Sequence, residues 1–552
     1  MRLSALLIVA LAWPGGAHAT GATALHRQVD ALFMPWSGAA TPGCAVGIAR
    51  DGVVDYARGY GMANLEHGIA ITPASVFHTS SMAKQVTAFA VGLLAQDGKL
   101  ALGDDIRRYL PELPDTGHPI TIAHLVHHTN GLREQGQMLN LAGWRGDDLY
   151  TEEDILWILS RQRSVNFAPG AEVVYGNAAY TLLAVIVRRV AGQPLEDFAA
   201  ARIFGPLGLH ATRFRADHTA VLAHRAAAYS PRARGGWHIA VPNIDHYGST
   251  SLMSTVGDLL AWQQNLVDGR VGGPGLRDWM RTEGVLDDGM GTGYGGGLRL
   301  GTFRGLRTIG HDGADGGYRS DMLLFPDQKL GIVALCNGGT IAPAALVRRV
   351  ADVYLGQQTT GPALAAPVPV PDSAQAVWAG TWWSAQTDEI VRLAWQDGAL
   401  RQPGVAVPLV ALGNDAFRPA DQAHDWRFRQ DAKGVAELRI RDFWPTVRVF
   451  TRIDAALPTA PALGALAGRY HSSETDMAYT VQLADGRLQL AWPRGYAVAL
   501  TPVGGDRFVG TIGTVTFMRA PGGAVSGIMV SNRRVRRFVA QRMDEAANDP
   551  WK

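Results

Sequence analysis

The chain has 552 residues, of which 47% are hydrophobic and 18% are charged. This composition is that of a globular protein, and the length predicts two to four domains rather than one core. The 51 basic and 49 acidic residues leave a net charge of +2 without a long run of one sign. We therefore expect neither nucleic acid nor an anionic membrane surface as a partner.

The N-terminus has the three parts of an export signal. Arg2 supplies the positive start, Leu3 to Trp13 the apolar centre, and Ala17-His18-Ala19 a cleavage site flanked by small residues. The apolar run is too short to span a bilayer, and no later stretch is long and apolar enough. We expect residues 1–19 to be a signal peptide and the mature protein to be periplasmic or secreted, without a membrane span.

Two cysteines, Cys44 and Cys336, lie in apolar runs that resemble strands. An exported protein meets an oxidising compartment, where disulfides form and persist. If the two strands are antiparallel neighbours, the start of one lies beside the end of the other, and a cross-strand disulfide can form. The alternative is two buried free thiols, because neighbouring strands rarely meet disulfide geometry.

The first half of the chain begins with strands and continues with helices. Residues 20–36 predict a short amphipathic helix, and residues 43–50 and 53–60 predict a hairpin around Asp51-Gly52. A helix headed by Ser81 follows and ends near Asp97. Residues 100–285 are mostly helical and rich in loops, with Thr255 and Asp258 predicting the capped start of a helix over residues 259–266.

Strands return after residue 293. They are expected over residues 295–300, 306–309, 319–325 and 331–336, followed by a helix over residues 342–355. Strands first, helices in the middle and strands last do not give the alternation of a doubly wound sheet. We therefore predict an α+β domain, residues 20–358, whose antiparallel sheet is flanked by helices and contains both ends of the domain.

The remaining chain carries an internal repeat. After a Pro- and Ala-rich linker over residues 359–373, Ala379-Gly380, Thr387-Asp388 and Asp397-Gly398 recur at Ala467-Gly468, Thr475-Asp476 and Asp485-Gly486, always with an offset of 88. A second such linker, residues 455–464, separates the copies. We predict two small antiparallel β-barrel domains, residues 373–454 and 465–545, with hairpins at the Asp-Gly pairs. Neither copy carries a recognisable nucleophile and base.

The first chemical motif is the pair Ser81 and Lys84. Residues three apart share one face of a helix, and a lysine kept poised to lose its proton can accept the proton of a hydroxyl. The chain has five lysines, and only Lys84 has a serine three residues before it. Ser80 is out of register, because the residue three positions later is Ala83.

Two further motifs are weak by themselves. In Tyr175-Gly176-Asn177, both side chains of a loop can face one cleft; a phenol beside an ammonium can fall in pKa and act as a base, and an amide can hold the lysine or a carbonyl. In the segment Gly310 to Gly317, His311 would face the cleft, and glycines such as Gly313 would let a substrate backbone lie along a strand edge.

Two other patterns carry less information. His127-His128 lacks the spacing of a metal site, so we expect packing at a helix end. Gly291-x-Gly293-x-x-Gly296 formally matches a dinucleotide fingerprint, but no strand precedes it and no helix follows, so we interpret it as a glycine-rich entry to a strand.

Together, Ser81-x-x-Lys84, Tyr175-x-Asn177 and His311-x-Gly313 resemble the serine β-lactamase and penicillin-recognition family over residues 25–355. The resemblance implies that Ser81 is acylated and that Lys84 and Tyr175 share the proton transfers. It also implies an oxyanion hole from the backbone N–H groups of Ser81 and Ala314, with Asn177 and His311 orienting the substrate. No metal or organic cofactor is implied.

Two features narrow the expected function: the histidine at position 311 and the two barrels expected after the catalytic domain. Many members have Lys where this chain has His311, and a neutral imidazole holds a carboxylate less firmly, so β-lactams and D-Ala-D-Ala termini are less favoured. A catalytic domain followed by two barrels resembles the D-stereospecific aminopeptidases of the family, in which a barrel loop associated with binding the substrate's free amine reaches the active site. We assign no acidic residue of this chain to that role.

The leading hypothesis is an exported serine hydrolase that forms an acyl-enzyme on Ser81 and cleaves small amides or peptides as a D-aminopeptidase. The same motifs fit an esterase, or a penicillin-binding carboxypeptidase or β-lactamase-like enzyme. An inactive cell-wall or ligand-binding scaffold is the alternative from another class. Small peptides, amides or esters are the expected partners, and the sequence does not indicate an oligomeric state.

Overall fold

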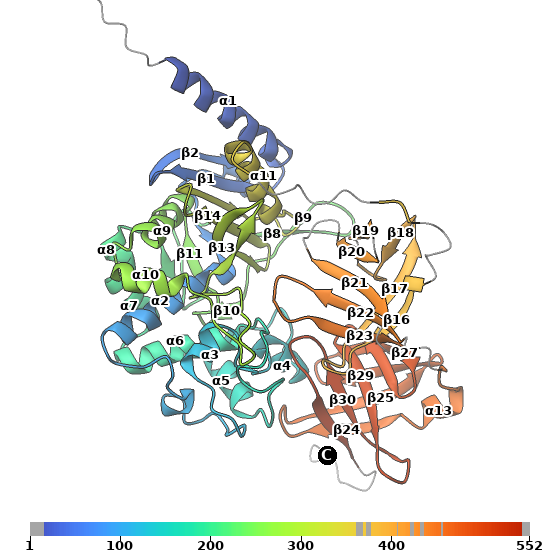
Figure 1. Ribbon diagram of the computed structural model, residues 1–552. Coiled ribbons are helices and arrows are strands. Elements are labelled where there is room, and N and C mark those ends of the chain that lie inside the picture. Colours follow the sequence, from blue (N-terminus) through green and yellow to red (C-terminus); the bar gives the residue numbers. More distant parts are fainter. Residues whose placement is uncertain are drawn as a thin grey trace, which may run out of the picture.

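The computed structural model describes residues 16–359, 368–370, 377–405, 407–413, 415–419, 424–430, 435–453 and 456–543. Within these residues the chain forms one α+β domain followed by two β-barrels (Figure 1). Most of the expected export signal, residues 1–15, lies outside the described residues. So do residues 360–367 and 371–376, which include most of the first expected linker.

The α+β domain is built on one antiparallel sheet of six strands, in the order β12-β13-β14-β15-β1-β2. The strands are β1 (Cys44–Arg50), β2 (Val53–Tyr60), β12 (Arg299–Phe303), β13 (Leu306–Asp315), β14 (Tyr318–Phe325) and β15 (Leu330–Cys336). Because β1 pairs with β15 along its whole length, the beginning and end of the domain meet inside the sheet. The predicted α+β fold class is confirmed.

Two strand predictions differ from the structure in their bounds. The strand expected over residues 295–300 begins only at Arg299, because Gly293 and Gly297 adopt positive φ angles and turn the chain. At Gly297 a Cβ atom would lie 2.6 Å from the backbone of Lys84. The turn therefore packs against the helix that carries the lysine. The strand expected over residues 306–309 continues to Asp315.

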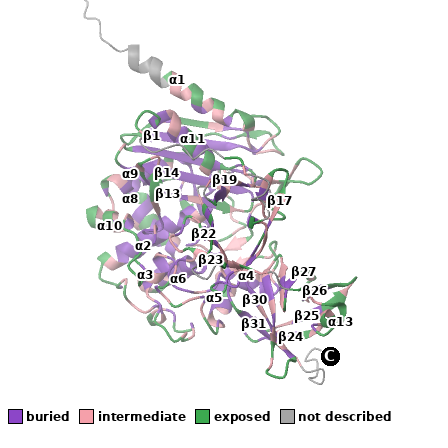
Figure 2. Ribbon diagram, turned by 45° about the vertical axis from the view of Figure 1, so that its right-hand side comes forward, coloured by how far each residue is buried: buried purple, intermediate pink, exposed green. Residues whose placement is uncertain are grey.

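Helices cover both faces of the sheet (Figure 1). On one face lie α1 (Gly16–Phe33) and α11 (Pro343–Leu355), and on the other lies α9 (Val256–Asp268), with further helices beyond it. Residues of β1 alternate between the faces: Val46 and Ile48 join the core under α1 and α11. At Gly47 a Cβ atom would lie 3.0 Å from Leu260, so α9 packs closely there because the residue is a glycine. Figure 2 shows that most of β1, β13 and β14 is buried.

The helical section contains mostly short elements. The helices are α2 (Ala83–Gln96), α3 (Ile122–Val126), α4 (Gln135–Leu141), α5 (Glu152–Ser160), α6 (Ala178–Ala191), α7 (Leu195–Ala199), α8 (Gly205–Leu207) and α10 (Gly273–Met280). Thr255 caps α9 by accepting a hydrogen bond from the backbone N–H of Asp258 at 3.2 Å, as the sequence predicts. The helix begins directly after its cap at Val256, three residues earlier than expected.

Short strands and turns connect these helices. The strands are β3 (Met62–Asn64), β4 (Ile69–Ala70), β5 (Phe77–His78), β6 (Tyr150–Thr151), β7 (Arg213–Phe214), β8 (Tyr229–Pro231), β9 (Trp237–Ile239), β10 (Ile244–Asp245) and β11 (Leu252–Ser254). The helix expected over residues 20–36 is α1 followed by the turn η1 (Met34–Trp36). Among the described residues no helix has the length and apolar character needed to cross a membrane.

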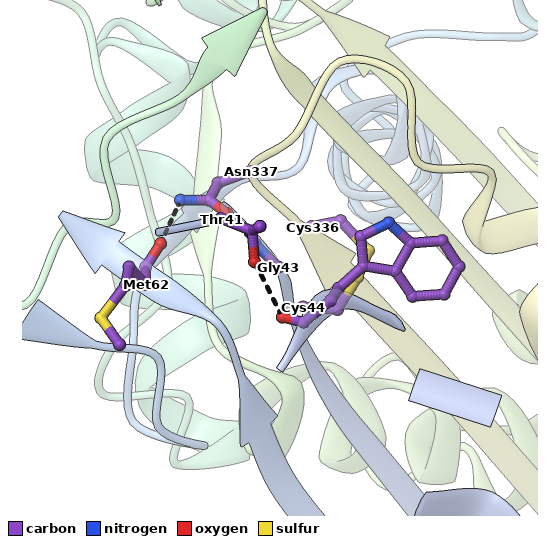
Figure 3. Close-up of a disulfide and its surroundings, with 7 residues drawn as sticks. Thr41, Gly43, Cys44, Met62, Cys336 and Asn337 are labelled. Atoms are coloured by element: carbon purple, nitrogen blue, oxygen red, sulfur yellow. Dashed lines mark hydrogen bonds between the residues drawn. A yellow bond between two sulfur atoms is a disulfide. The ribbon is translucent and has the colours of Figure 1, made fainter. Parts of the chain in front are cut away.

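Cys44 and Cys336 form a disulfide between β1 and β15 (Figure 3). The two residues lie directly opposite each other in the antiparallel pair, with a Cα–Cα distance of 4.0 Å. Next to them, the Asn337 amide accepts from Gly43 N–H at 2.8 Å and donates to the Met62 carbonyl at 2.9 Å. The cross-strand disulfide, one of the two alternatives left by the sequence, is therefore the one found.

The first barrel is closed and has eight strands. They are β16 (Gly380–Trp383), β17 (Ile390–Gln396), β18 (Ala399–Arg401), β19 (Leu409–Gly413), β20 (Ala416–Pro419), β21 (Asp425–Gln430), β22 (Ala436–Arg441) and β23 (Arg448–Arg452). Its core, which includes Trp382, Phe417 and Leu438, is separate from the core of the α+β domain.

The second barrel has the same architecture. Its strands are β24 (Gly468–Ser472), β25 (Met477–Ala484), β26 (Arg487–Trp492), β27 (Tyr496–Gly504), β28 (Arg507–Gly510), β29 (Gly513–Arg519), β30 (Val525–Ser531) and β31 (Phe538–Arg542). The repeat is also conformational: Asp397-Gly398 and Asp485-Gly486 all adopt positive φ angles, as a tight hairpin requires. The segment expected as the second linker contains a short exposed helix, α13 (Ala460–Gly464) (Figure 2).

The second barrel packs directly on the α+β domain beside α4 (Figure 1). The hydroxyl of Tyr479 donates to the carbonyl of Leu141 at 2.7 Å, and the indole of Trp492 donates to the carbonyl of Asn140 at 3.0 Å. Buried side chains of this barrel are continuous with the core of the α+β domain. The loops of the second barrel are therefore held at a defined place on the first domain.

Candidate active site

Ser81 lies in a tight turn, η2 (Ser80–Met82), at the start of α2. It is partly exposed, whereas both neighbours in the turn are buried. Ser80 has a φ angle of 55°, which is uncommon for a residue other than glycine, and its hydroxyl lies 3.3 Å from the ring of His78. The turn thus presents Ser81 to solvent and directs Ser80 into the protein, in agreement with the expected register.

Lys84 is completely buried one turn further along the helix. Its ammonium nitrogen Nζ lies 3.1 Å from Ser81 Oγ, 2.9 Å from Asn177 Oδ1 and 2.7 Å from the carbonyl oxygen of Ser249. Burial disfavours the charged form and lowers the pKa of Lys84 to about 7. The predicted pair of a hydroxyl and a poised lysine is therefore present, and the carbonyl of Ser249 completes its surroundings.

Asn177 and Glu134 form a second layer around the lysine. Asn177 stands at the start of α6, where its backbone N–H donates to Glu134 Oε2 at 2.6 Å. Among the charges near Lys84, that of Glu134 acts most strongly, and it raises the pKa of the lysine against the larger effect of burial. Glu134 is not predicted from the sequence, because a single carboxylate before a short helix matches no motif.

The ring of Tyr175 lies over Lys84, with Nζ 4.9 Å from the ring centroid. Its hydroxyl is buried and has no hydrogen bond of ordinary length within the described part of the chain. Burial raises the pKa of Tyr175 well above its ordinary value. The nearby Ser81 hydroxyl lowers this pKa, but its effect is smaller than that of burial. The expected fall in the pKa of this phenol is therefore not found, and Lys84 is the group whose pKa suits a base near neutral pH.

His128 forms the floor beneath Tyr175. Its ring is buried, with centroids 4.4 Å from Tyr175 and 4.8 Å from Tyr294. Burial lowers its pKa, so the imidazole is neutral. The expectation that His127-His128 serves packing at a helix end agrees with this position, since α3 ends at Val126. No motif in the sequence indicates that the packing partner of His128 is Tyr175.

His311 differs from its expected position facing the cleft. Its ring is buried, with Nδ1 2.6 Å from the carbonyl of Asp312 and Nε2 2.9 Å from the hydroxyl of Tyr294. A carbonyl only accepts, so Nδ1 carries the proton and the tyrosine donates to Nε2. Burial, aided by the charge of Arg299, lowers the pKa of His311 to about 3. Both ring nitrogens are engaged in hydrogen bonds, and the neutral ring packs beside Tyr175.

Gly313 and Ala314 lie where β13 passes the turn that carries Ser81. A Cβ atom at Gly313 would lie 2.3 Å from the carbonyl of Thr79 and 3.0 Å from Ser80, so only glycine permits this approach. Ala314, the next residue, is exposed. Strand β12 pairs with β13 only as far as Gly310, so that edge of residues 311–315 is not covered by β12. An extended substrate can lie there beside Ser81.

Both barrels contribute a residue to the site. Trp444, in the loop between β22 and β23, stacks on Tyr175 with centroids 5.9 Å apart and planes at 24°. Arg534, in the loop between β30 and β31, places its guanidinium carbon 5.6 Å from the centroid of the same ring. Neither residue is predicted from the sequence, because nothing in the local sequence of a barrel loop indicates which distant surface it covers.

Comparison with known proteins agrees with this arrangement. The family model described as Beta-lactamase matches residues 29–357. The chain belongs to the beta-lactamase family. Within that family it is a serine hydrolase, and the matched segment contains the Ser81 turn, the lysine, the tyrosine and strand β13.

The relatives extend the similarity of this family member beyond the catalytic domain. A D-aminopeptidase of Cereibacter sphaeroides is 26% identical over 546 residues, which cover 95% of this chain and 98% of that protein. A D-aminopeptidase of Gluconobacter oxydans is 26% identical over 467 residues, 84% of this chain and 85% of its own. The similarity to the Cereibacter protein therefore extends into the part of the chain that forms the barrels.

Solved structures share the fold at lower identity. The octameric penicillin-binding protein homologue from Pyrococcus abyssi superposes with a TM-score of 0.55 at 21% identity, covering 79% of this chain and all of that one. The D-amino acid amidase from Ochrobactrum anthropi SV3 gives a TM-score of 0.50 at 21% identity, covering 61% of this chain and 99% of its own.

Proposed function

We propose that this serine hydrolase is an exported D-aminopeptidase that cleaves short peptides and amides through an acyl-enzyme on Ser81. The observation that carries the proposal is the set of acceptors around Lys84. A neutral amine has two hydrogens and one lone pair. The oxygens of Asn177 and Ser249 can only accept, so they take both hydrogens, and the lone pair is left facing the hydroxyl of Ser81.

This arrangement supplies the first chemical step. Lys84 takes the hydroxyl proton as Ser81 Oγ attacks the substrate carbonyl, and a tetrahedral oxyanion forms. The backbone N–H groups of Ser81 and Ala314 are the donors proposed for that oxyanion, since β13 passes directly beside the turn. The proton then passes from Lys84, next to Tyr175, to the leaving amine. Water then attacks the ester on Ser81. Lys84 takes the proton of the water and returns a proton to Ser81 Oγ as the acid product leaves.

Three observations support the aminopeptidase activity over the other activities found in the family. The relatives that are similar over nearly the whole chain, barrels included, are D-aminopeptidases. In addition, Trp444 and Arg534 close over Tyr175 from two separate domains, which favours a small substrate. His311 is neutral and fully engaged, so it is poorly suited to hold the carboxylate of a β-lactam.

Export is supported by the N-terminal pattern and by the disulfide. Cleavage after Ala19 would remove the first residues of α1 and leave the segment that packs near α11. The disulfide between Cys44 and Cys336 suits an oxidising compartment, since cytosolic proteins keep such thiols reduced. N-terminal sequencing of the protein recovered from the periplasm or the medium tests this part.

The activity is tested with matched substrates and a matched pair of serine variants. We expect D-alanyl p-nitroanilide to be hydrolysed faster than the L-isomer and faster, relative to chemical hydrolysis, than p-nitrophenyl acyl esters. Ser81→Ala should abolish turnover and labelling by a fluorophosphonate, whereas Ser80→Ala should keep both. Efficient turnover of esters alone would support the esterase, and a stable penicilloyl adduct would support the penicillin-binding enzyme.

A further inference from the structure

Arg534 occupies a rigid position in the loop Ser531–Arg537 of the second barrel. Its carbonyl accepts from the Glu134 backbone N–H at 3.1 Å and from the Asn166 amide at 2.9 Å, both in the catalytic domain. Its backbone N–H donates to Asn532 Oδ1 at 3.0 Å. The backbone of Arg534 is thus held between the two domains, and its side chain extends over Tyr175.

Within the described part of the chain, the guanidinium of Arg534 lacks the carboxylate partner that Arg533 and Arg536 have. Arg533 pairs with Asp442, and Arg536 pairs with Glu172 through two hydrogen bonds of 3.1 and 2.9 Å. For the half-buried Arg534, no carboxylate or carbonyl in the described part of the chain accepts a hydrogen bond from its guanidinium. Five N–H donors in a fixed fork therefore remain available beside Tyr175.

Among the described residues, the other basic groups of the site and two of its carboxylates are already paired or engaged. Arg299 pairs with Asp312, and Glu134 accepts from the backbone of Asn177. His311 is neutral and has both ring nitrogens engaged. Lys84 is directed at Ser81 and its two oxygen acceptors. Among the described residues around Tyr175, Arg534 is therefore the cation whose charge is left for a substrate.

We propose that Arg534 binds the carboxylate of a short peptide substrate, on the side of the leaving amino acid. This inference rests on the proposed function, in which the proton for the leaving amine passes beside Tyr175. Arg534 lies over that same ring, so a carboxylate one residue beyond the scissile bond is the group it would meet. A guanidinium fork matches a carboxylate through two parallel hydrogen bonds. The enzyme would then prefer free peptides to their amides.

Two substrates that differ only in this group test the inference. D-alanyl-glycine and D-alanyl-glycinamide have the same scissile bond and the same free amine. We expect kcat/KM to be about tenfold or more higher for the acid, because a charge-assisted hydrogen bond contributes that much discrimination. Arg534→Gln should remove this preference mainly through KM for the acid, and Arg534→Lys should retain part of it. Equal values for both peptides, or an unchanged preference in Arg534→Gln, would overturn the inference.

Arg537→Gln is the matched control, since Arg537 lies in the same loop with an exposed side chain. It should keep the wild-type preference for the acid. The same selectivity is measurable without turnover, by titrating both peptides calorimetrically into Ser81→Ala and into Ser81→Ala with Arg534→Gln. If neither peptide is hydrolysed but the acid binds tighter through Arg534, the proposed activity fails and this inference stands. If both peptides are hydrolysed without selectivity, the proposed activity stands and this inference fails. If neither peptide binds, the inference is refuted.

Discussion

Arg133 of the catalytic domain and Glu474 of the second barrel form a buried ion pair. The side chain of Arg133 is fully buried and that of Glu474 is 9% exposed. The same guanidinium donates from Nε to the carbonyl of Arg536 and from Nη2 to that of Arg537, both at 3.1 Å. One side chain therefore fixes both the barrel and the loop that places Arg534 over Tyr175.

Breaking this pair should destabilise the protein strongly. Glu474→Gln leaves the cation of Arg133 buried without its counter-charge, and we expect a loss of about 3–5 kcal/mol in unfolding free energy. The measurement is the midpoint of urea unfolding. The matched control is Asp506→Asn, which breaks the exposed pair with Arg519 in the same barrel and should cost about 0–1 kcal/mol. Equal effects of the two variants would contradict this view of the interface.

The activity should rise with pH around neutrality. Lys84 acts as a base only when neutral, and its pKa is about 7, so kcat/KM should increase as the pH rises through that value. The charge of Glu134 raises the pKa of Lys84, so Glu134→Gln should move the acidic limb of the pH profile to lower pH. Glu66→Gln, at an exposed carboxylate, should leave it in place. A shift of the limb to higher pH in Glu134→Gln would be incompatible with this assignment.

The same lysine should make stability depend on pH. Its pKa is about 7 in the native state against 10.5 without burial, so above pH 7 the unfolded chain binds a proton that the native state lacks. Stability from this group therefore rises with pH between about 7 and 10. The expected result is that the unfolding free energy of the wild type, relative to Lys84→Met, increases over this window. A difference independent of pH would show that the lysine keeps an ordinary pKa.

Removing the disulfide should weaken the sheet where the ends of the domain meet. It joins residues separated by 292 positions, so it restricts the unfolded chain strongly. Replacing both Cys44 and Cys336 by serine should cost about 2–5 kcal/mol, measured as a lower urea midpoint. A reductant should lower the midpoint of the wild type and leave that of the double variant unchanged. An effect of reductant on the double variant would point to another cause.

Trp444 should support catalysis from the first barrel. Its ring stacks on Tyr175, and such aromatic pairs contribute about 0.5–1.5 kcal/mol beyond their buried area. We expect Trp444→Ala to lower kcat/KM by roughly tenfold and Trp444→Phe to lower it less. Circular dichroism would verify that both variants remain folded. Full activity in Trp444→Ala would mean that the barrel only covers the tyrosine.

The structural features that depend on a short stretch of sequence, or on a repeat, agree with the predictions. The spacing of Ser81 and Lys84 places both on one turn of a helix, and Asp51-Gly52 between alternating strands forms the hairpin expected. The offset of 88 residues corresponds to the two barrels, whose first strands begin at Gly380 and Gly468. Each signal is local or repeated, so backbone geometry alone links it to structure. The strand bounds near Gly297 failed because packing on Lys84, distant in sequence, turns the chain.

The amino-acid sequence by itself determined the fold class, the two barrels and the position of Ser81 and Lys84 on one turn of a helix. Only the tertiary structure decided how these groups are charged and what encloses them. Burial lowers the pKa of Lys84, raises that of Tyr175 and keeps His311 neutral. Trp444 and Arg534 contact Tyr175 although both lie more than 200 residues after it in the sequence. Desolvation and electrostatic interactions depend on every neighbour in space, and the spacing of residues along a chain does not specify those neighbours.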